Sequence, residues 1–346
     1  MAMAPLITVS LVTFNSRDEI ERCLQCLDAQ SLQDFEVRIW DNASTDGTVE
    51  FLKSLSLPRL SLFCSGTNVG FCAAHNHIIE ESGAEFVLVL NPDCYLESHY
   101  LEAAVGAARK NPCIGAVAGK LYRLRTPSED FEVARREGIL DSTGTYFTPS
   151  FRHFDRGSNE VEGGRYSLEE WVFGVTGAAG FYRRGMLEDI QIDGEYFDEA
   201  FFAYREDADL AWRMQSAGWQ CLYTPQAVGY HVRKVFPAGR SRVAEAINMH
   251  SVKNRFLFRL NNVAWPTCVR FFLPMAVRDI GVLGYTILFE HSSLPGLSNI
   301  ARNFRARWKR RQKIQSKRKV SLSSLHRWIH WRPTAFPKET SLQDGP

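Results

Sequence analysis

The sequence lacks the signals of a secreted, zinc-binding or membrane-spanning protein. No basic stretch precedes the apolar residues near the N-terminus, so a secretory signal is not expected there. The eight cysteines are scattered, and the pair Cys23 and Cys26 has neither a second pair nor clustered histidines to complete a zinc site. Charges divide the apolar stretch 268–290 into runs of about ten residues, whereas a spanning helix needs roughly twenty. We therefore expect buried free thiols and a cytoplasmic protein without a spanning segment.

The length and composition are those of an ordinary globular protein. The 346 residues are 45% hydrophobic and 23% charged, so the chain can form one large α/β domain with an appendage, or two smaller domains. The net charge of +2 conceals an asymmetry, however. Residues 291–338 contain thirteen Lys or Arg and no Asp or Glu, which leaves a net charge of about −11 on the rest of the chain. We expect this basic tail to be electrostatically separate from the remainder.

Apolar runs alternate with helix-like segments in the first part of the chain. The runs 6–14, 35–40 and 86–90 have the composition of strands, and residues 18–29 have apolar positions at helical spacing. Alternating strands and helices with continuous apolar strands predict a mostly parallel sheet that is covered on both faces. Ligands bind such sheets at the carboxyl ends of the strands.

Polar residues follow each predicted strand, where a ligand is expected. Thr13, Phe14 and Asn15 follow the first strand, and their backbone groups can meet a nucleotide base. Asp41 and Asn42 follow the second strand, where they can accept from and donate to the edge of a pyrimidine base. A turn or side-chain cap explains this second pair equally well.

Two further polar motifs follow in sequence. Asn68 and Gly70 form an N-V-G motif that permits close backbone approach to ribose or diphosphate, although such a motif alone is normally a turn. Asn91 and Asp93 follow the third run, and a carboxylate at that position suits Mg²⁺ or Mn²⁺, which bind one or two carboxylates together with phosphate oxygens.

Three carboxylates, Glu206, Asp207 and Asp209, follow directly after an aromatic-rich run. Charges beside so much apolar surface lose hydration, so they are expected to be paired, ligand-bound or shifted in pKa, which is typical of general bases. The alternative is structural, because acidic residues favour the first turn of a helix and Asp209 can pair with Arg213 four residues later.

Six motifs in this order resemble the inverting GT-A glycosyltransferases of family 2, and within them the bacterial rhamnosyltransferase-like group. The resemblance extends from residue 7 to about residue 231, and the motifs are VSLVTFN, WDNASTDGT, NVGFCAAHN, LNPD, VTGAAGFYRR and EDADLAWR. It implies a GT-A fold with a Rossmann-like sheet over residues 1–240. Within it, residues 1–125 would bind the nucleotide and residues 126–240 the acceptor. Residues 241–346 would form a helical, basic extension.

The resemblance also implies a role for each motif. Asp207 would be the general base that takes the proton of the acceptor hydroxyl during a single displacement at the anomeric carbon, with Glu206 orienting it or meeting the acceptor. A divalent metal, Mg²⁺ or Mn²⁺, would offset charge on the leaving diphosphate, held by Asp93 and His231. His231 can equally be a core histidine. The residues expected at the nucleotide-sugar donor, dTDP- or UDP-linked, are Thr13, Phe14, Asn15, Asp41, Asn42, Asn68, Gly70, Asn91 and Asp93.

Acceptor contacts are expected from Trp171, Gly177 and Ala178. Trp171 and Trp212 could stack on a sugar face, although tryptophans are more often core residues. One departure concerns the metal, because the family's D-x-D motif is here N-P-D and keeps a single carboxylate, Asp93.

The C-terminal region suggests a membrane surface. Residues 268–290 fit an interfacial amphipathic helix, and the basic tract 302–319 that follows could hold anionic phospholipid or a polyprenyl diphosphate. We therefore expect a peripheral protein at the inner face of the cell membrane, acting on a surface glycan or a lipid-linked acceptor. The alternative is a packed helix with a solvated basic tail.

Two other function classes fit part of the sequence. A nucleotidyltransferase that makes sugar nucleotides normally carries a Gly-rich loop after the first strand, but residues 13–20 contain no glycine. A nucleic-acid-binding protein could use residues 302–332, where Trp308, Trp328 and Trp331 alternate with basic residues. That hypothesis leaves the first 230 residues without a role, so no nucleic-acid partner is expected.

Overall fold

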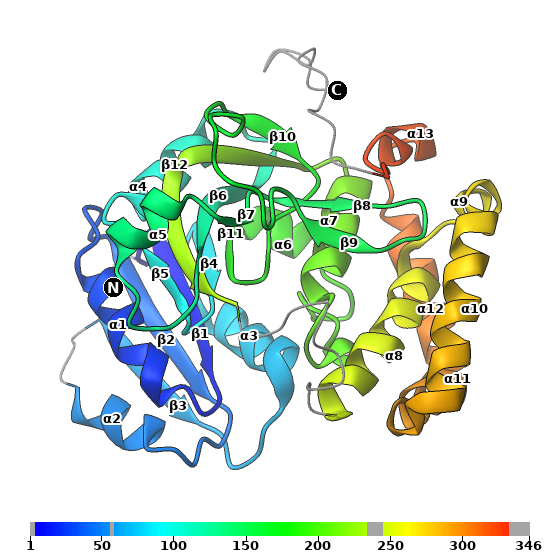
Figure 1. The fold of residues 1–346 in the computed structure, drawn as a ribbon, viewed down its shortest axis with the longest axis horizontal. Helices are drawn as coiled ribbons and strands as arrows, with labels where there is room; N and C mark the ends of the chain where they lie inside the picture. Colours follow the sequence, from blue (N-terminus) through cyan, green and yellow to red (C-terminus); the bar gives the residue numbers. More distant parts are fainter. Residues whose placement is uncertain (1–3, 56–58, 234–244, 332–346) are drawn as a thin grey trace.

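The computed structural model describes residues 4–55, 59–233 and 245–331. A central sheet with helices on both faces forms the larger part, and the C-terminal helices pack beside it on the right of Figure 1. This arrangement confirms the predicted α/β class and the helical C-terminal region. It also positions the carboxyl ends of the central strands, where the candidate site lies.

The first half of the chain forms parallel strands in the order β3-β2-β1-β4. β1 (Ile7–Thr13) and β4 (Phe86–Leu90) are almost wholly buried, as their continuous apolar sequences predict. β2 is Phe35–Asp41 and β3 is Leu60–Cys64. The helices that connect or follow these strands are α1 (Arg17–Asp28), α2 (Thr48–Ser54) and α3 (Gly70–Glu81).

The second half adds antiparallel pairing, so the sheet is mixed. β11 (Ala179–Arg183) runs antiparallel between β4 and β6 (Ile114–Leu124), and β12 (Gln220–Val232) pairs parallel with β6. β10 (Glu170–Val172) and β5 (Cys94–Leu96) pair with β12, β7 (Leu140–Ser142) pairs with β6, and β8 (Thr145–Phe147) and β9 (His153–Asp155) form a separate hairpin. The helical segments here are α4 (Tyr100–Arg109), α5 (Phe131–Glu137), α6 (Arg184–Ile190), η1 (Glu199–Phe201) and α7 (Glu206–Ser216).

The C-terminal helices are part of the same core. Phe258 packs with Phe147 of β8 and Trp212 of α7, with ring centroids 5.1 and 5.6 Å apart. Trp212 is only 1% exposed, so it is a core residue and not a sugar platform. The elements of this region are α8 (Glu245–Asn262), α9 (Trp265–Arg270), α10 (Phe272–Phe289), η3 (His291–Ser293), α11 (Leu294–Arg302), α12 (Phe304–Ser316) and α13 (Leu322–His326).

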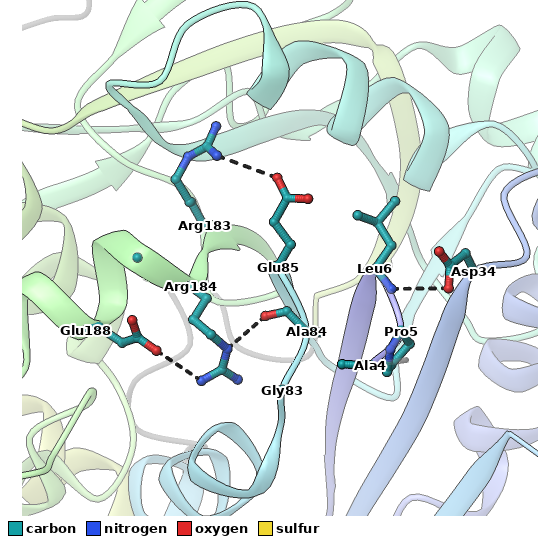
Figure 2. Close-up of a pocket in the computed structure, with 11 residues that line it drawn as sticks. Ala4, Pro5, Leu6, Asp34, Gly83, Ala84, Glu85, Arg183, Arg184 and Glu188 are labelled. Atoms are coloured by element: carbon teal, nitrogen blue, oxygen red, sulfur yellow. Dashed lines mark hydrogen bonds and ion pairs between the residues drawn. The ribbon is translucent and has the colours of Figure 1, made fainter. Parts of the chain in front are cut away.

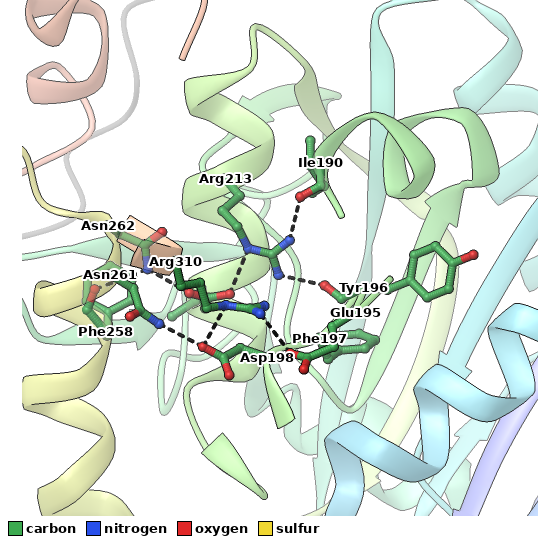
Figure 3. Close-up of polar contacts among 12 residues, drawn as sticks. Ile190, Glu195, Tyr196, Phe197, Asp198, Arg213, Phe258, Asn261, Asn262 and Arg310 are labelled. Carbon is green, nitrogen blue, oxygen red and sulfur yellow. Dashed lines mark hydrogen bonds and ion pairs between the residues drawn. The ribbon is translucent and has the colours of Figure 1, made fainter. Parts of the chain in front are cut away.

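The expectation that the basic tail is electrostatically separate is wrong for its central stretch. Arg310 of α12 lies 2.8 Å from Glu195 and 3.0 Å from Asp198 (Figure 3). Arg307 binds Asp198 at 2.9 Å. Lys313 pairs with Asp193, and Lys319 with Asp189. The tail therefore neutralises an acidic strip of the sheet domain. A sequence cannot reveal this pairing, because the partners are separated by more than a hundred residues.

The structure also tests the expected free thiols and the aromatic residues of the nucleic-acid-binding hypothesis. All eight cysteines are free thiols, and four of them are buried, whereas Cys64 is exposed. Trp328 is buried in the core, so it does not contribute to an alternating basic and aromatic surface for nucleic acid.

Candidate active site

The expected donor residues lie at one edge of the sheet. Thr13 and Asp41 are register partners at the carboxyl ends of β1 and β2. Asn91 directly follows β4, the other neighbour of β1. The backbone N–H of Asn42 donates to the carbonyl of Thr13 at 2.8 Å, which closes this edge.

Asp41 and Asn42 form hydrogen bonds that hold the segments at this edge of the sheet together. Asp41 is fully buried and accepts hydrogen bonds from the Thr13 hydroxyl at 2.8 Å and the Ser44 N–H at 2.9 Å. The turn-forming alternative is therefore confirmed for Asp41, and its contact with a base stays a prediction. Asn42 accepts from the Val69 N–H at 3.2 Å and so ties β2 to the N-V-G loop. Phe14 and Asn15 are exposed beside it.

Only glycine fits at position 70, because of both the backbone conformation and the nearby ring of Phe202. Gly70 has φ +88°, and a Cβ there would lie 2.5 Å from the ring of Phe202. The Asn68 carboxamide accepts from the Gly70 N–H at 2.9 Å, and the Cys72 N–H donates to the Phe202 carbonyl at 3.1 Å. Close approach to ribose stays a prediction, whereas the close approach shown is to the segment that leads to the carboxylates.

That segment is strained and held from α8. Phe202, Tyr204 and Arg205 have φ values of 67°, 70° and 71°, which cost about 1–3 kcal/mol each in a non-glycine residue. The buried Asn254 amide lies within 3.0 Å of the carbonyls of residues 201, 203 and 204. Lys253 donates to the Ala200 carbonyl at 2.6 Å. Such strain is typical of functional sites, and here it precedes Glu206 directly.

The three acidic residues of α7 have different surroundings. Asp209 is buried and binds Arg213 at 2.8 Å and Asn262 at 2.6 Å, so the predicted i,i+4 ion pair is confirmed and Asp209 is structural. Asp207 is half-buried and accepts from the N–H groups of Ala208 at 2.7 Å and Gly177 at 3.3 Å. Its Oδ1 also lies 3.7 Å from His153 Nε2 on β9.

Burial changes the protonation of the Glu206 and Asp207 pair. It raises the pKa of Asp207, and together with the adjacent Asp207 charge it raises the pKa of Glu206 to about 8. Oε2 of Glu206 is buried and accepts no hydrogen bond from another described residue. At neutral pH Glu206 is therefore largely protonated. A carboxylate with a raised pKa is better matched to proton abstraction.

A dipeptide between β10 and β11 connects the two motifs. The Gly177 N–H binds Asp207, and the Ala178 carbonyl accepts from the Asn91 N–H at 2.9 Å. Tyr204 lies near both motifs: burial raises the pKa of its hydroxyl, and the charges of Glu206 and Asp93 raise it further. Asp207 and the N-P-D motif therefore lie at one site. Trp171 is on β10, partly buried against the core, and its acceptor contact stays a prediction.

Asp93 and His231 face each other, with Asp93 Oδ1 3.4 Å from His231 Nε2. The other ring nitrogen, Nδ1, is 2.8 Å from the buried Asp141, which fixes the ring. Burial lowers the pKa of His231, but the charges of Asp141 and Asp93 outweigh it and raise the pKa to about 10.

Once its ring is deprotonated, His231 fits a divalent cation together with Asp93, because a bound cation would displace the proton that the charges of Asp141 and Asp93 hold there. Asp93 Oδ1 is buried and, apart from its 3.4 Å contact with His231 Nε2, has no hydrogen-bond donor among the described residues. Asp141 supplies the second-shell carboxylate that an Asp–His–metal arrangement needs. No group of three or more His, Cys, Asp or Glu side chains in the described ranges is placed to hold a metal alone. The remaining ligands would come from water and phosphate, as is usual for Mg²⁺.

A separate cavity lies at the opposite edge of the sheet. It has a volume of about 590 Å³ and is lined by residues at the amino ends of β1, β2 and β4. Figure 2 shows that Arg183 and Arg184 border it, paired with Glu85 and Glu188. Arg184 also donates to the backbone carbonyl of Ala84 at 2.8 Å. The cavity is therefore distinct from the candidate active site.

Comparison with known proteins decides the family. Residues 8–190, more than half of the chain, match the family described as glycosyl transferase family 2. The chain belongs to glycosyltransferase family 2. The resemblance drawn from the six motifs is therefore confirmed, and this glycosyltransferase transfers sugar from a nucleotide-sugar donor, which excludes the nucleotidyltransferase alternative.

Its relatives are distant. The glycosyltransferase is 27% identical to the N-acetylglucosaminyl-diphospho-decaprenol L-rhamnosyltransferase of Mycobacterium tuberculosis H37Rv over 292 residues, which cover 78% of this chain and 90% of the relative. It is 30% identical to glycosyltransferase AglE of Haloferax volcanii over 105 residues, which cover 29% of this chain and 34% of that one.

Solved structures support the GT-A fold of the glycosyltransferase. TarS 1–349 of S. aureus, in complex with UDP-GlcNAc, has a TM-score of 0.52 and 16% identity over 94% of this chain and 93% of that one. The mannosyltransferase PcManGT of Pyrobaculum calidifontis, in complex with GDP-Man and Mn²⁺, has a TM-score of 0.50 and 17% identity over 91% and 86%. At these identities the likeness concerns the fold alone.

Motif reasoning missed several residues of the site. His153 lies beside Asp207, Asn254 holds the strained segment, and Asp141 orients His231. None of these residues belongs to a motif, and each reaches the site from another part of the chain. The sequence contains no local signal that could have identified them.

We predict that Gly70→Ala lowers the transfer rate and destabilises the protein by about 1–3 kcal/mol. The added Cβ would collide with Phe202, which belongs to the strained segment before Glu206. Gly47→Ala is a matched control, because Gly47 has φ +90° and nothing within 4 Å of its Cβ position. Equal losses of kcat in the two variants would contradict the prediction. Melting temperature and kcat measure the two effects.

We also predict a pH-dependent effect of Glu206→Gln. Glu206 stays protonated in the folded protein up to about pH 8, whereas in the unfolded chain it ionises near its usual pKa of about 4.3. The folded state binds the extra proton within this window, so the free energy of unfolding falls as the pH rises through it. Gln cannot ionise.

The melting temperature of Glu206→Gln should therefore rise relative to that of the wild type between about pH 5 and pH 8. Each unit of pKa difference corresponds to about 1.4 kcal/mol. Glu188→Gln, at an exposed glutamate, is the control and should show no such trend. Parallel curves for Glu206→Gln and the wild type would show that Glu206 is ionised in the folded protein.

Proposed function

We propose that this enzyme transfers a sugar, L-rhamnose in the first instance, with inversion from a nucleoside-diphosphate donor to a hydroxyl group of a lipid-linked glycan acceptor. The observation that carries the proposal is the position of Asp207, half-buried and bound to Gly177, whose neighbour Ala178 binds Asn91 of the N-P-D motif. The predicted base Asp207 and the predicted diphosphate-binding motif around Asn91 are thus both bound to the dipeptide Gly177 and Ala178.

The mechanism follows from the charges of the site. The acceptor hydroxyl approaches Asp207, its oxygen forms a bond to the anomeric carbon, and its proton passes to the Asp207 carboxylate. The bond from that carbon to the diphosphate oxygen breaks in the same displacement, and the nucleoside diphosphate leaves. Protonated Glu206 leaves the negative charge on Asp207. The buried His153, whose pKa is lowered to about 3, stays neutral.

A divalent cation would be held by Asp93 and His231 and, when bound, would offset the charge on the departing diphosphate. The buried oxygen of Asp93 and the Asp141 hydrogen bond to His231 support this assignment. The structural neighbours solved with Mn²⁺ share the fold.

The sugar and the acceptor are proposed from the relative in M. tuberculosis. That protein's name specifies L-rhamnose as the transferred sugar and a diphospho-decaprenol-linked N-acetylglucosamine as the acceptor. The match covers 90% of the relative's length. We propose the same substrate classes here, with dTDP as the donor nucleotide.

Asp207→Asn should lower kcat by about 10²- to 10⁴-fold, the range that a general base contributes. Asn is nearly isosteric and can still accept from the Gly177 N–H, so nucleotide binding and melting temperature should stay close to those of the wild type. The measurement is release of free dTDP from dTDP-L-rhamnose with a lipid-linked N-acetylglucosamine acceptor.

The same assay tests the donor. UDP-GlcNAc and GDP-mannose are the comparison donors, and faster turnover of either would overturn the choice of rhamnose while leaving the role of Asp207 intact. Unchanged kcat in Asp207→Asn would refute the base assignment itself.

We further propose that α9 and α10 lie on the membrane surface. α10 is the one helix in the described ranges that is long and apolar enough to cross a membrane by length and composition. Its large apolar side chains are, however, between 64% and 74% exposed at Phe272, Leu273, Val277, Ile280, Leu288 and Phe289. Trp265 and Val269 of α9 are similarly exposed. A contiguous exposed face of this kind is rare on soluble monomers.

The outer face of α10 is apolar and its charged residue Asp279 faces the protein, the reverse of a helix on a water-facing surface. Asp279 points toward the protein and binds Arg255 and Arg259 of α8, at 3.5 and 2.6 Å. Met275 and Thr286 are buried on the same side. The outward stripe of Leu273, Val277, Ile280 and Leu288 is apolar, which favours a peripheral position with that stripe in the lipid headgroup region.

We predict that Leu273→Ser, Ile280→Ser and Leu288→Ser together move the protein from the membrane fraction to the soluble fraction. Each substitution removes apolar area that would otherwise enter the lipid. The matched control is Phe63→Ser, Val161→Ser and Leu168→Ser, because these apolar residues are similarly exposed on other elements. Co-flotation with phosphatidylglycerol vesicles measures the same effect in vitro. If both triple variants distribute as the wild type does, the α10 surface is not the membrane contact.

A further inference from the structure

Five arginines from four separate segments lie close to one another, and one of them, Arg205, interacts with the charge of Asp207. One comes from the loop between β8 and β9, one precedes α7, two lie on α8 and one lies on α10: Arg152, Arg205, Arg255, Arg259 and Arg278. We call this group the arginine cluster. Since none of these residues lies in a motif of the family resemblance, the cluster is a product of the tertiary fold.

The cluster reaches the predicted base through one histidine. Arg205 Nη1 lies 3.4 Å from His153 Nδ1, and His153 Nε2 lies 3.7 Å from Asp207 Oδ1. At the other end Asp279 binds both Arg255 and Arg259, so one carboxylate serves two guanidinium groups. Among the described residues, arginines therefore outnumber carboxylates between Asp207 and α10.

Mutual repulsion within the cluster is visible in the pKa values. Burial and neighbouring arginines together lower the pKa of Arg205 to about 10 and that of Arg255 to about 9, although the charges of Asp207 and Asp279 act in the opposite direction. Burial and Arg278 also lower the pKa of Arg152. All of them stay protonated at neutral pH. An anion placed among them would relieve this repulsion and receive charge-assisted hydrogen bonds.

The location distinguishes an acceptor anion from a donor anion. The donor side is defined by Asp93 and His231, with Asp141 and Arg233 behind them. The cluster instead lies on the α8 and α10 side of Asp207, and α10 carries the exposed apolar stripe on its opposite face. A ligand with a diphosphate group and an apolar chain fits a basic site beside an apolar surface.

We propose that the arginine cluster binds the diphosphate group of the lipid-linked acceptor, with Arg152, Arg205 and Arg255 as its principal ligands. The acceptor sugar would then extend from the diphosphate toward Asp207. The assignment of this anion to the acceptor rests on the proposed function, whereas anion binding by the cluster does not. The basic tract 302–319, the earlier candidate for this ligand, is partly neutralised by acidic residues of the sheet domain.

The test uses the full-length protein and farnesyl diphosphate as the probe. Titration calorimetry should detect binding of farnesyl diphosphate, weaker binding of inorganic pyrophosphate and none of farnesol. Arg152→Gln and Arg255→Gln should each weaken farnesyl diphosphate binding tenfold or more, since each removes a charge-assisted contact. Arg302→Gln and Arg305→Gln, on the exposed surface of the tail, are the matched controls and should bind as the wild type does.

Binding of dTDP and UDP is measured in the same variants. We expect it to be unchanged, and the wild type should bind farnesyl diphosphate and nucleotide at the same time. Competition between the two, or equal loss of nucleotide binding in Arg152→Gln and Arg255→Gln, would assign the cluster to the donor and overturn the proposal. Unchanged farnesyl diphosphate binding in folded variants would show that the cluster is only structural.

Vesicle binding distinguishes a polyprenyl diphosphate from an anionic phospholipid as the ligand of the arginine cluster. Phosphatidylcholine vesicles that contain a polyprenyl diphosphate should bind more tightly than those that contain phosphatidylglycerol at equal charge, and Arg255→Gln should remove the difference. Equal binding to both would show that the cluster reads only membrane charge and would overturn the proposal. Absence of sugar transfer to the lipid acceptor, with these binding results intact, would refute the proposed function without touching anion binding by the cluster.

Discussion

The contact between the Asn254 amide and the backbone of residues 201–204 is the constraint on which the site depends. Phe202, Tyr204 and the following Arg205 have positive φ, at a cost of about 1–3 kcal/mol each, and α8 and the Gly70 loop hold the segment in this shape. The strained turn sets the start of α7 and therefore the direction of Asp207. A helix from the C-terminal region thus shapes the centre of a domain whose motifs all lie before residue 232.

The charge asymmetry of the chain acquires a structural meaning in the same region. The tail cations bind acidic residues of the sheet domain, which fastens α12 against the segment before α7. α10 then covers the arginines of α8 with its single carboxylate and turns its apolar side outward. The C-terminal helices therefore serve two purposes. They brace the candidate active site from one side and present an apolar surface on the other.

Two adjacent carboxyl groups whose pKa values are raised by burial give the site its chemical character. Backbone N–H groups bind the Asp207 carboxylate and favour its charged form, whereas Oε2 of Glu206 accepts no hydrogen bond among the described residues. His153, whose pKa is lowered by burial, contacts both Asp207 and Arg205, and no arginine in the described ranges forms an ion pair with Asp207. In our proposal Asp207 acts as the base, and the neighbouring arginine cluster binds the acceptor.

The sequence by itself determined the family, the α/β class and three strands, predicted at residues 6–14, 35–40 and 86–90 and found at 7–13, 35–41 and 86–90. It also offered the ion pair of Asp209 with Arg213 as an alternative, which the structure contains. These features are local, because hydrophobic period, motif order and i,i+4 spacing are properties of neighbouring residues. Only the tertiary structure decided that the basic tail pairs with the sheet domain, that α10 is reversed in polarity, and that His153, Asn254 and the arginine cluster reach the site. Each of these depends on contacts between residues that are far apart in the chain, and no pattern in a single sequence encodes which distant charge or amide a side chain will meet.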